Sequence, residues 1–361
     1  MYVGVIFSPV KKTSKARENE ELADCEGITT AEVVKEALEK FGHRVERVCL
    51  DPAEFQKLQK FDWIFNLAES VNGFELADHE VAARLEALGI PFTGSGSRTL
   101  RICADKALAK ELLDHHRINT PSFQSFEQGD EIIPLIDFPL FVKPAHEDAS
   151  IGITTGSVVY NQRQLVRQVR RVQRIYRQPA LVEEYIDGRD ISVAFLGNRD
   201  DRVILPPSEC VYLPDFPEPR ILTFEAKWKG DSVAFKNSVS RCPAELDAEL
   251  TAAVQAIGAR AFDLVDCRDY ARVDFRLKDR TLYLLEVNPN PCISLYDSGL
   301  IRAGAAVGLD YDRVILTILE QSVKALKWSQ AVKNRRHYIE TARARAYPVR
   351  PVLNSKDSIE Y

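Results

Sequence analysis

Residues 270–291, which read YARVDFRLKDRTLYLLEVNPNP, carry polar side chains that could hold a metal ion beside a reacting group. Asp274 and Glu286 supply carboxylates, and Asn288 adds a neutral amide oxygen. Oxygen ligands of this kind suit Mg²⁺, which binds few carboxylates and completes its shell with phosphate oxygens and water. Arg272 could neutralise negative charge that develops on a nearby acyl or phosphoryl group. The segment therefore indicates metal-assisted chemistry on a carboxylate or a phosphate.

Apolar residues alternate with these polar ones, so the segment predicts a β-hairpin with one buried face. A three-residue loop over 278–280 places Arg272 opposite Glu286 and Asp274 opposite Leu284. Asp274 and Glu286 are then diagonal neighbours on one face, about 7–8 Å apart at the backbone. The predicted apolar face consists of Val273, Phe275, Leu277, Tyr283, Leu285 and Val287.

An ordinary half-exposed hairpin would show the same alternation of polar and apolar residues. The Asn-Pro-Asn-Pro run at residues 288–291 favours a site, because its prolines fix the direction of the chain just after the ligands.

The elements that must position this hairpin begin with strand–helix alternation near the start of the chain. Strands are predicted near residues 2–8, 43–50 and 61–69, and helices near 30–42 and 74–89. This alternation predicts an open parallel sheet in an α/β domain over residues 1–95. The domain contains no G-x-G-x-x-G motif, so a dinucleotide site is not expected.

A central region over residues 96–187 is predicted to hold a helix at 105–116 and a strand–loop–strand segment at 138–153. Its second helix, at 161–177, carries five arginines on its polar face. The overall charge of the chain favours a solvated helix surface over an anion-binding face there.

The third region, 188–325, starts at the turn signal Asp187-Gly188, which joins two predicted strands. It holds a predicted helix at 243–262, opened by Pro243 in its first turn, then the hairpin and a last helix near 310–327. Residues 326–361 are basic and lack a sustained apolar stripe, which is typical of an appendage to the core.

Composition narrows the class of protein. The net charge is −5, which disfavours a nucleic-acid partner. No apolar run approaches the roughly 20 residues that span a membrane, and the short apolar start predicts a first strand rather than a signal peptide. The seven cysteines are widely spaced without a C-x-x-C pair, so neither a disulfide framework nor a zinc site is expected. Together these features predict a cytoplasmic protein.

Several motifs along residues 60–320 resemble those of ATP-grasp enzymes, and most closely the D-alanine–D-alanine ligase family. They are GIPFTGSG, DKALAK, FVKPAHEDASIGI, VEEYIDGRDISVAFLG, EAKW and the hairpin itself. The resemblance implies a three-domain ATP-grasp fold of the α/β (α+β) class, in which the parallel sheet precedes two ATP-grasp subdomains with ATP between them. It also implies ATP and Mg²⁺ (or Mn²⁺) as cofactors, small carboxylate and amine substrates, and a homodimer.

The resemblance assigns roles to residues at matching positions. The implied ATP-binding residues are Lys106, Lys143, Glu183, Glu184, Ile186, Asp190 and Lys227. Among them Lys106 contacts phosphate, Lys143 is a second ATP-binding lysine, and Lys227 lies near the γ-phosphate. Glu183 accepts from the adenine amino group and Asp190 binds ribose, while Glu184 and Ile186 act through their backbones. Asp274, Glu286 and Asn288 match the magnesium ligands, and Arg272 matches the arginine that stabilises the tetrahedral intermediate. Ser150 lies in the loop HEDASIG, which matches the loop that covers the phosphates.

The implied reaction has two steps. A substrate carboxylate attacks the γ-phosphate to give an acyl phosphate and ADP, and an amine then displaces phosphate from the acyl carbon. Cations are needed because charge concentrates on the transferred phosphoryl oxygens. A closed site protects the acyl phosphate from water.

The departures from the family pattern lie where the amino acids bind. The first loop has no glycine, and its glutamates Glu18, Glu20 and Glu21 are equivalent candidates for the first substrate's ammonium group. A family serine becomes Ala149, a tyrosine becomes Trp228 and a glycine becomes Cys292. A carboxylate-binding serine falls near Asp297, with Ser298 as a substitute. Candidates for first-substrate contacts are Glu69, Glu75 and His79.

Three functions fit this pattern. The leading prediction is an ATP-dependent ligase that joins a carboxylate to an amine. The second is a D-alanine–D-alanine ligase with an unusual first loop, which the substituted substrate positions disfavour. The third is an inactive nucleotide-binding scaffold, which the retention of Arg272, Asp274, Glu286 and Asn288 disfavours.

Overall fold

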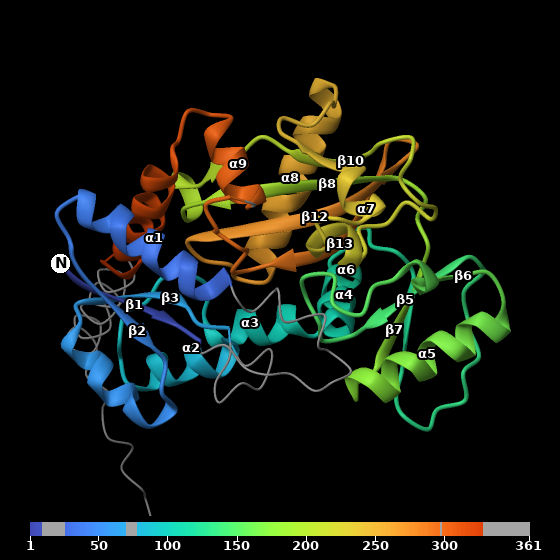
Figure 1. Ribbon diagram of the computed structural model, residues 1–361, viewed down its shortest axis with the longest axis horizontal. Coiled ribbons are helices and arrows are strands. Elements are labelled where there is room, and N and C mark those ends of the chain that lie inside the picture. The colour runs from blue at the N-terminus through green and yellow to red at the C-terminus, as the bar shows by residue number, and fades with distance from the viewer. Residues whose placement is uncertain (9–25, 70–77, 297, 328–361) are drawn as a thin grey trace, which may run out of the picture. The chain divides into compact units, whose positions relative to one another are not determined.

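The computed structural model describes residues 1–8, 26–69, 78–296 and 298–327 (Figure 1). Residues Met1–Ser322 form one compact unit, and Val323–Tyr361 form a second. Most of the predicted basic appendage lies outside the described residues. The boundaries predicted for three domains stay predictions, but the first unit does contain three separate sheets. None of the helices within the described ranges has both the length and the apolar character needed to cross a membrane.

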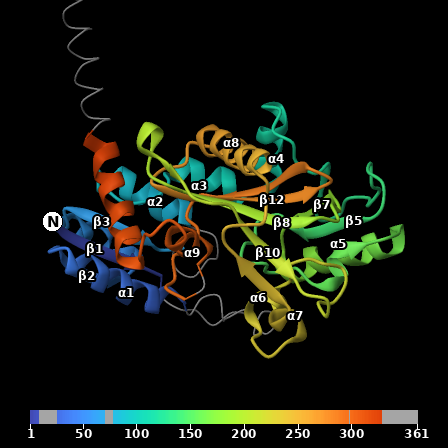
Figure 2. The same cartoon turned by 90° about the horizontal axis from the view of Figure 1, so that it is seen from above.

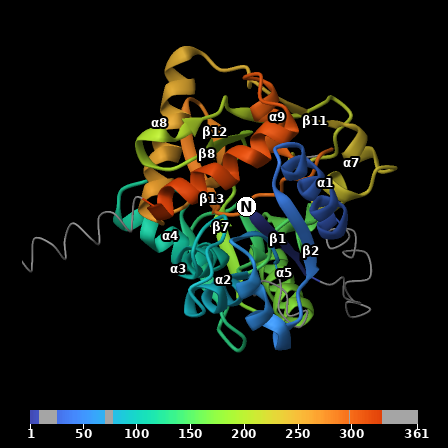
Figure 3. The ribbon, with the colours of Figure 1, turned by 90° about the vertical axis from the view of Figure 1, so that its left-hand side faces the viewer.

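The first sheet is parallel, as the sequence predicts, with strand order β2-β1-β3. Its strands are β1 (Tyr2–Phe7), β2 (Arg44–Cys49) and β3 (Trp63–Leu67). The helical elements here are α1 (Glu26–Lys40), η3 (Pro52–Lys60) and α2 (Asp78–Ala87). Helix α1 packs on β1 and β2 (Figure 3), while α2 and η3 contribute to a core with Ile6 and Ile64. Side chains that follow β1 and β3 therefore lie at one edge of this sheet.

The second sheet is antiparallel, with order β4-β7-β5-β6. Its strands are β4 (Phe123–Phe126), β5 (Leu140–Pro144), β6 (Val158–Val159) and β7 (Ala180–Glu184). Helix α5 (Gln162–Tyr176) packs its apolar stripe on β5, β6 and β7, and its N-cap Asn161 accepts from the backbone of Gln164. The strand predicted just after the 145–150 loop is wrong: the chain makes a short η4 turn (Thr155–Ser157) before β6.

The third sheet is the largest, with order β11-β10-β8-β12-β13 and β9 paired to β8. The strands are β8 (Arg189–Leu196), β9 (Val203–Ile204), β10 (Ser208–Tyr212), β11 (Ser238–Arg241), β12 (Tyr270–Lys278) and β13 (Thr281–Asn288). The strands on either side of Asp187-Gly188 do not pair with each other. The turn instead carries the chain from β7 in one sheet to β8 in the next.

Helices complete these layers. They are α3 (Ser97–Ala104), α4 (Lys106–His115), α6 (Phe224–Trp228), α7 (Val233–Lys236), α8 (Ala248–Leu264) and α9 (Gly299–Ala305), with η5 at Arg199–Asp201. A further helix begins at residue 311, as predicted near 310. The predicted start of α8 at Pro243 is wrong, because the Asp247 side chain caps Leu250 and starts the helix at Ala248.

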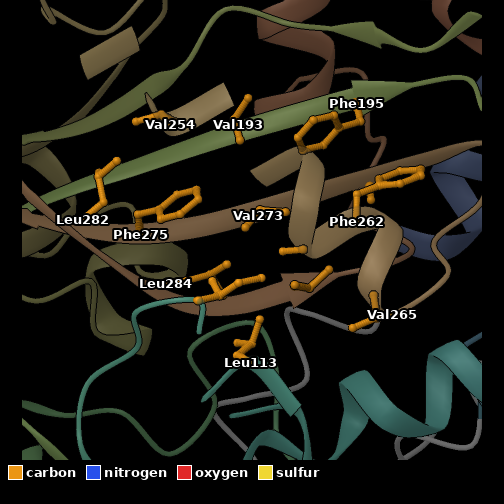
Figure 4. Packing of buried hydrophobic residues seen from close by; sticks show 14 of the residues in the cluster. Leu113, Val193, Phe195, Val254, Phe262, Val265, Val273, Phe275, Leu282 and Leu284 are labelled. Carbon is orange, nitrogen blue, oxygen red and sulfur yellow. The ribbon is translucent and has the colours of Figure 1, made fainter. Parts of the chain in front are cut away.

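The core that supports the hairpin lies between α8 and the third sheet (Figures 2 and 4). Val193 and Phe195 of β8 and Val273 and Phe275 of β12 pack with Phe262 of α8. The apolar face of β13 consists of Leu282, Leu284 and Val287. This corrects the predicted face on β13, since Tyr283 and Leu285 point away from this core.

Close packing of α8 on β8 depends on Gly258. A Cβ atom at this position would lie 2.7 Å from Val193 Cγ1 and 2.9 Å from Phe195 Cζ. We expect Gly258→Ala to lower the free energy of unfolding by about 1–3 kcal/mol, because the methyl group overpacks the interface. Denaturant titration measures this, with Ala256→Val on the exposed side of the same helix as the control. Equal stability of the two variants would contradict the close approach.

Candidate active site

A cleft of ≈ 2030 Å³ is lined by all three sheets. Asn66 and Glu69 come from the end of β3, Lys143 and Glu183 from the second sheet, and Asp274 from the third. The residues predicted for ATP, metal and acyl chemistry all line it: Lys106, Lys143, Ser150, Glu183, Glu184, Ile186, Asp190, Lys227, Arg272, Asp274, Glu286 and Asn288. The fold thus brings together residues that are far apart in the sequence.

The strands of the hairpin pair in a different register from the predicted one, but Asp274 and Glu286 still lie on one face. Its loop has two residues, Asp279 and Arg280, both at positive φ, which is typical of the tight turns that match strand twist. A β-bulge then shifts the pairing so that Asp274 lies directly opposite Glu286, and Arg272 opposite Asn288. The predicted three-residue loop and diagonal pairing are therefore wrong. The bulge itself turns Glu286 to the cleft, because the unshifted register would pair it with buried Val273.

The carboxylates of the candidate metal ligands Asp274 and Glu286 interact with positively charged and polar side chains of the protein itself. Arg272 donates to both oxygens of Asp274, from Nε at 2.7 Å and from Nη2 at 2.8 Å. Asn288 donates from Nδ2 to Asp274 Oδ2 at 3.0 Å. Burial alone would raise the pKa of Glu286, but the nearby cations Lys106, Lys143 and Arg272 hold it down at about 2. Glu286 is therefore an anion at any physiological pH.

The donor set fits Mg²⁺. Within the described residues, no group of three or more His, Cys, Asp or Glu side chains is placed to hold a metal ion. Two carboxylates on facing strands with an amide oxygen beside them is the smaller set that Mg²⁺ uses when substrate phosphates and water fill its remaining positions.

Three lysines, Lys106, Lys143 and Lys227, place positive charge around these carboxylates. Lys106 Nζ lies 3.2 Å from Glu286 Oε2 and 2.7 Å from Asp148 Oδ1. Burial would lower the pKa of Lys106, but these two carboxylates raise it overall. Burial lowers the pKa of Lys227, and the neighbouring Arg272 acts in the same direction. Such a concentration of cations suits a polyphosphate.

The loop over residues 146–153 bends across this part of the cleft. Ala149 and Ser150 both adopt positive φ, at 53° and 62°. The indole Nε1 of Trp228 donates to the Ala149 carbonyl at 2.9 Å, and the Phe224 N–H donates to the Ile153 carbonyl at 3.1 Å. Helix α6 therefore fastens the loop at both of its sides.

We expect Trp228→Phe to raise the KM for ATP by about fivefold, since it keeps an aromatic ring but removes one hydrogen bond of about 1 kcal/mol. Steady-state kinetics measures this change. Thermal unfolding of the same variant is the control, and it should move little because Trp228 lies at the cleft surface. Unchanged KM values for all substrates would show that the bond does not hold the loop.

Glu183 lies between two lysines in the cleft wall. Lys110 Nζ is 2.8 Å from its Oε1, and Lys143 Nζ is 2.9 Å from its Oε2. The sequence analysis missed Lys110. Its signal was the DKALAK motif, where Lys110 lies four residues after Lys106 and so on the same face of α4.

Asp190 lines the cleft, but its carboxylate already has protein partners. Arg276 Nε lies 2.8 Å from its Oδ1, and the Tyr212 hydroxyl donates to Oδ2. Burial raises the pKa of Asp190 in spite of the Arg276 charge. Arg276 also donates to the Gly188 carbonyl at 2.6 Å, which fastens the turn between β7 and β8. Contact of Asp190 with ribose stays a prediction.

The candidate substrate residues are placed unevenly. The exposed Cys292 lines the cleft beside Arg272. Ser298 is only 2% exposed and caps α9: its hydroxyl donates to the Cys292 carbonyl at 2.6 Å and accepts from Ile301 N–H. Glu69 lines the cleft, and its N–H donates to the Ser8 hydroxyl. His79 lies in the first turn of α2 next to Asp78, which does line the cleft.

Five other candidates fall outside the described residues: Glu18, Glu20, Glu21, Glu75 and Asp297. Ser298 does not have a free hydroxyl proton to donate to a substrate carboxylate, because that proton is already donated to the Cys292 carbonyl.

Comparisons with known proteins show the family to which the chain belongs. The family described as D-ala D-ala ligase C-terminus matches residues 113–320. An uncharacterized protein, y4sG of Sinorhizobium fredii, is 35% identical over 302 residues, covering 80% of this chain and 86% of its own. A D-alanine–D-alanine ligase of Syntrophotalea carbinolica is 30% identical over 293 residues, covering 81% of this chain and 90% of its own.

A solved structure supports the same fold. The D-alanine–D-alanine ligase of Bacillus anthracis, in complex with ATP, superposes with a TM-score of 0.72 at 24% identity, covering 91% of this chain and 99% of that one. The predicted ATP-grasp fold, with a parallel sheet followed by antiparallel sheets, is confirmed. The chain belongs to the D-alanine–D-alanine ligase family of ATP-grasp proteins, which are ATP-dependent ligases that form carbon–nitrogen bonds.

Proposed function

We propose that the protein uses Mg²⁺-ATP to join a small carboxylic acid, of amino-acid type, to an amine through an acyl phosphate. The observation that carries this proposal is the cleft in which Arg272, Lys106, Lys143 and Lys227 surround the paired carboxylates Asp274 and Glu286. A nucleotide-binding scaffold would have no need of an arginine beside the metal ligands.

The residues divide the work between the two steps. Lys106, Lys143 and Lys227 bind the phosphates and offset the charge on the transferred group, while Asp274, Glu286 and Asn288 would hold Mg²⁺. When bound, this ion supplies Lewis-acid stabilisation of the phosphoryl oxygens. The first step forms a bond between a carboxylate oxygen and the γ-phosphorus and breaks the bond to ADP.

In the second step the amine nitrogen attacks the acyl carbon, the carbon–oxygen bond to phosphate breaks, and the amine loses a proton. Arg272 would stabilise the oxyanion of the tetrahedral intermediate. The loop over residues 146–153, fastened by Trp228, would exclude water from the acyl phosphate.

A D-alanine–D-alanine ligase is the second candidate, and it is favoured by the 30% identity to the D-alanine–D-alanine ligase of Syntrophotalea carbinolica. Against two D-alanines stand the cleft-facing thiol of Cys292 and the use of Ser298 as a helix cap. A homodimer and a cytoplasmic location stay predictions of the sequence.

Phosphate release from Mg²⁺-ATP, measured with amino acids and small carboxylic acids singly and in pairs, tests the proposal. Each positive acid is repeated with hydroxylamine, which converts an acyl phosphate to a hydroxamate. Acid-dependent release with hydroxamate supports the ligase and names its first substrate. Release with D-alanine alone supports the second candidate. ATP binding with no stimulation by any acid or pair would count against both.

A further inference from the structure

A buried lysine behind the nucleotide wall has no role in the chemistry proposed above. Lys110 is 1% exposed and does not line the cleft. It reaches Glu183 Oε1 at 2.8 Å and the Thr120 hydroxyl at 2.5 Å. A buried ammonium group costs several kcal/mol of desolvation unless a partner offsets it. The partner that offsets this cost is the carboxylate of Glu183.

Glu183 lines the cleft, whereas its partner Lys110 does not. It is 2% exposed in strand β7 and lies between Phe123 of β4 and Phe141 of β5 in the sheet. Its Oε1 faces the interior lysine, and its Oε2 faces Lys143, which lines the cleft. The two oxygens thus differ in their surroundings: one faces an ammonium group in the interior, and the other faces an ammonium group that lines the cleft.

Lys143 alone would not neutralise the Glu183 carboxylate once a nucleotide binds. The same ammonium group is one of the cations proposed for phosphate, and it lies near Glu286 as well as Glu183. If Lys143 turned to a phosphate, a Glu183 without Lys110 would be a buried carboxylate with no counter-charge. Such a group takes up a proton, and it then donates a hydrogen bond instead of accepting one.

We propose that Lys110 is a positioning residue for base recognition: it keeps Glu183 an acceptor for the exocyclic amino group of the purine and leaves Lys143 free for phosphate. This inference rests on the proposed use of ATP and on the contact between Glu183 and adenine that the family resemblance implies. Burial alone would raise the pKa of Glu183, but Lys110 and Lys143 lower it overall. Burial lowers the pKa of Lys110 to about 8, against the pull of Glu183 and aided by Lys143, so the lysine is still mostly charged at pH 7.

The inference predicts a specific choice between bases. An ionised Glu183 accepts from the 6-amino group of adenine and repels the 6-oxo group of hypoxanthine. A protonated Glu183 would instead donate to the 6-oxo group. Lys110 therefore sets the preference for ATP over ITP without touching either nucleotide, and a lysine that only packed helix α4 would leave that preference unchanged.

The test measures dissociation constants of ATP and ITP, both with Mg²⁺, for the unchanged full chain and four variants: Lys110→Met, Glu183→Gln, the double variant of these two, and a control. We expect Lys110→Met to weaken ATP at least about tenfold and to lower the ATP-over-ITP preference by a similar factor. In a Glu183→Gln background, adding Lys110→Met should change the ATP constant less than about threefold, since Lys110 acts through Glu183. Lys57→Met, at an exposed lysine of η3, is the matched control.

Two results would overturn the inference. One is an unchanged ATP-over-ITP preference in Lys110→Met. The other is an equal loss of ATP affinity from Lys110→Met in the wild-type and Glu183→Gln backgrounds. If Lys110→Met alone fails to fold, the double variant, which removes both charges, is compared with Glu183→Gln, and the same threefold limit decides. Failure of the wild-type protein to bind ATP would instead refute the proposed function.

Discussion

Replacement of Arg272 by methionine is expected to lower kcat by about two to three orders of magnitude, while the KM for ATP changes little. The expected loss is that of a donor aimed at charge that develops only during the reaction. Methionine keeps much of the aliphatic volume but removes the guanidinium group that donates to both oxygens of Asp274. The measurement is the steady-state rate of phosphate release with the acid and amine that the substrate panel identifies.

The half-maximal Mg²⁺ concentration separates this role from a structural one. Because Arg272 competes with the metal ion for Asp274, its removal leaves that carboxylate with the Asn288 amide as a donor, and the Mg²⁺ requirement should stay the same or fall. Arg272→Lys is the matched variant. It keeps the positive charge but not the two parallel hydrogen bonds to Asp274, so its kcat should lie between the kcat values of the wild-type protein and Arg272→Met. A higher Mg²⁺ requirement in Arg272→Met with normal kcat would mean that Arg272 only orders the metal ligands.

The hairpin shows what local sequence pattern can and cannot predict. Alternation correctly put Asp274 and Glu286 on one face, because the period of a strand is two residues. It gave the wrong loop length and the wrong partners, since the bulge at Leu285 leaves no mark in the alternation itself. The loop and pairing errors offset each other, so the same-face prediction was confirmed while the register was wrong.

Contacts between distant segments were beyond the reach of pattern analysis. Nothing local to Asp190 indicates that Arg276 and Tyr212 hold both of its oxygens, because those partners come from two other strands of the sheet. The same holds for the partner of Lys110, since Glu183 comes from strand β7, far along the chain. By contrast, Ser298 could have been predicted as a cap, since a serine before a short helix is the usual N-cap.

Replacement of Asp274 by asparagine is expected to raise the half-maximal Mg²⁺ concentration at least about 10–100-fold. Loss of an outer partner of a metal ligand costs about that much, so loss of a charged ligand costs no less. The amide has nearly the same shape, but it no longer carries the negative charge that Mg²⁺ and Arg272 share. Rates measured across a Mg²⁺ titration, with ATP in fixed excess over the enzyme, report the change.

Asp279→Asn is the matched control, because Asp279 lies at the exposed tip of the same hairpin at φ 46°, which asparagine tolerates. It should leave the Mg²⁺ titration as in the wild type. An Asp274→Asn protein with an unchanged titration would exclude this carboxylate as a ligand, since no other effect of the substitution restores the lost charge. A Mg²⁺ requirement that rises in Asp274→Asn but does not rise in Arg272→Met is the result expected if one carboxylate is shared between an arginine and a metal ion.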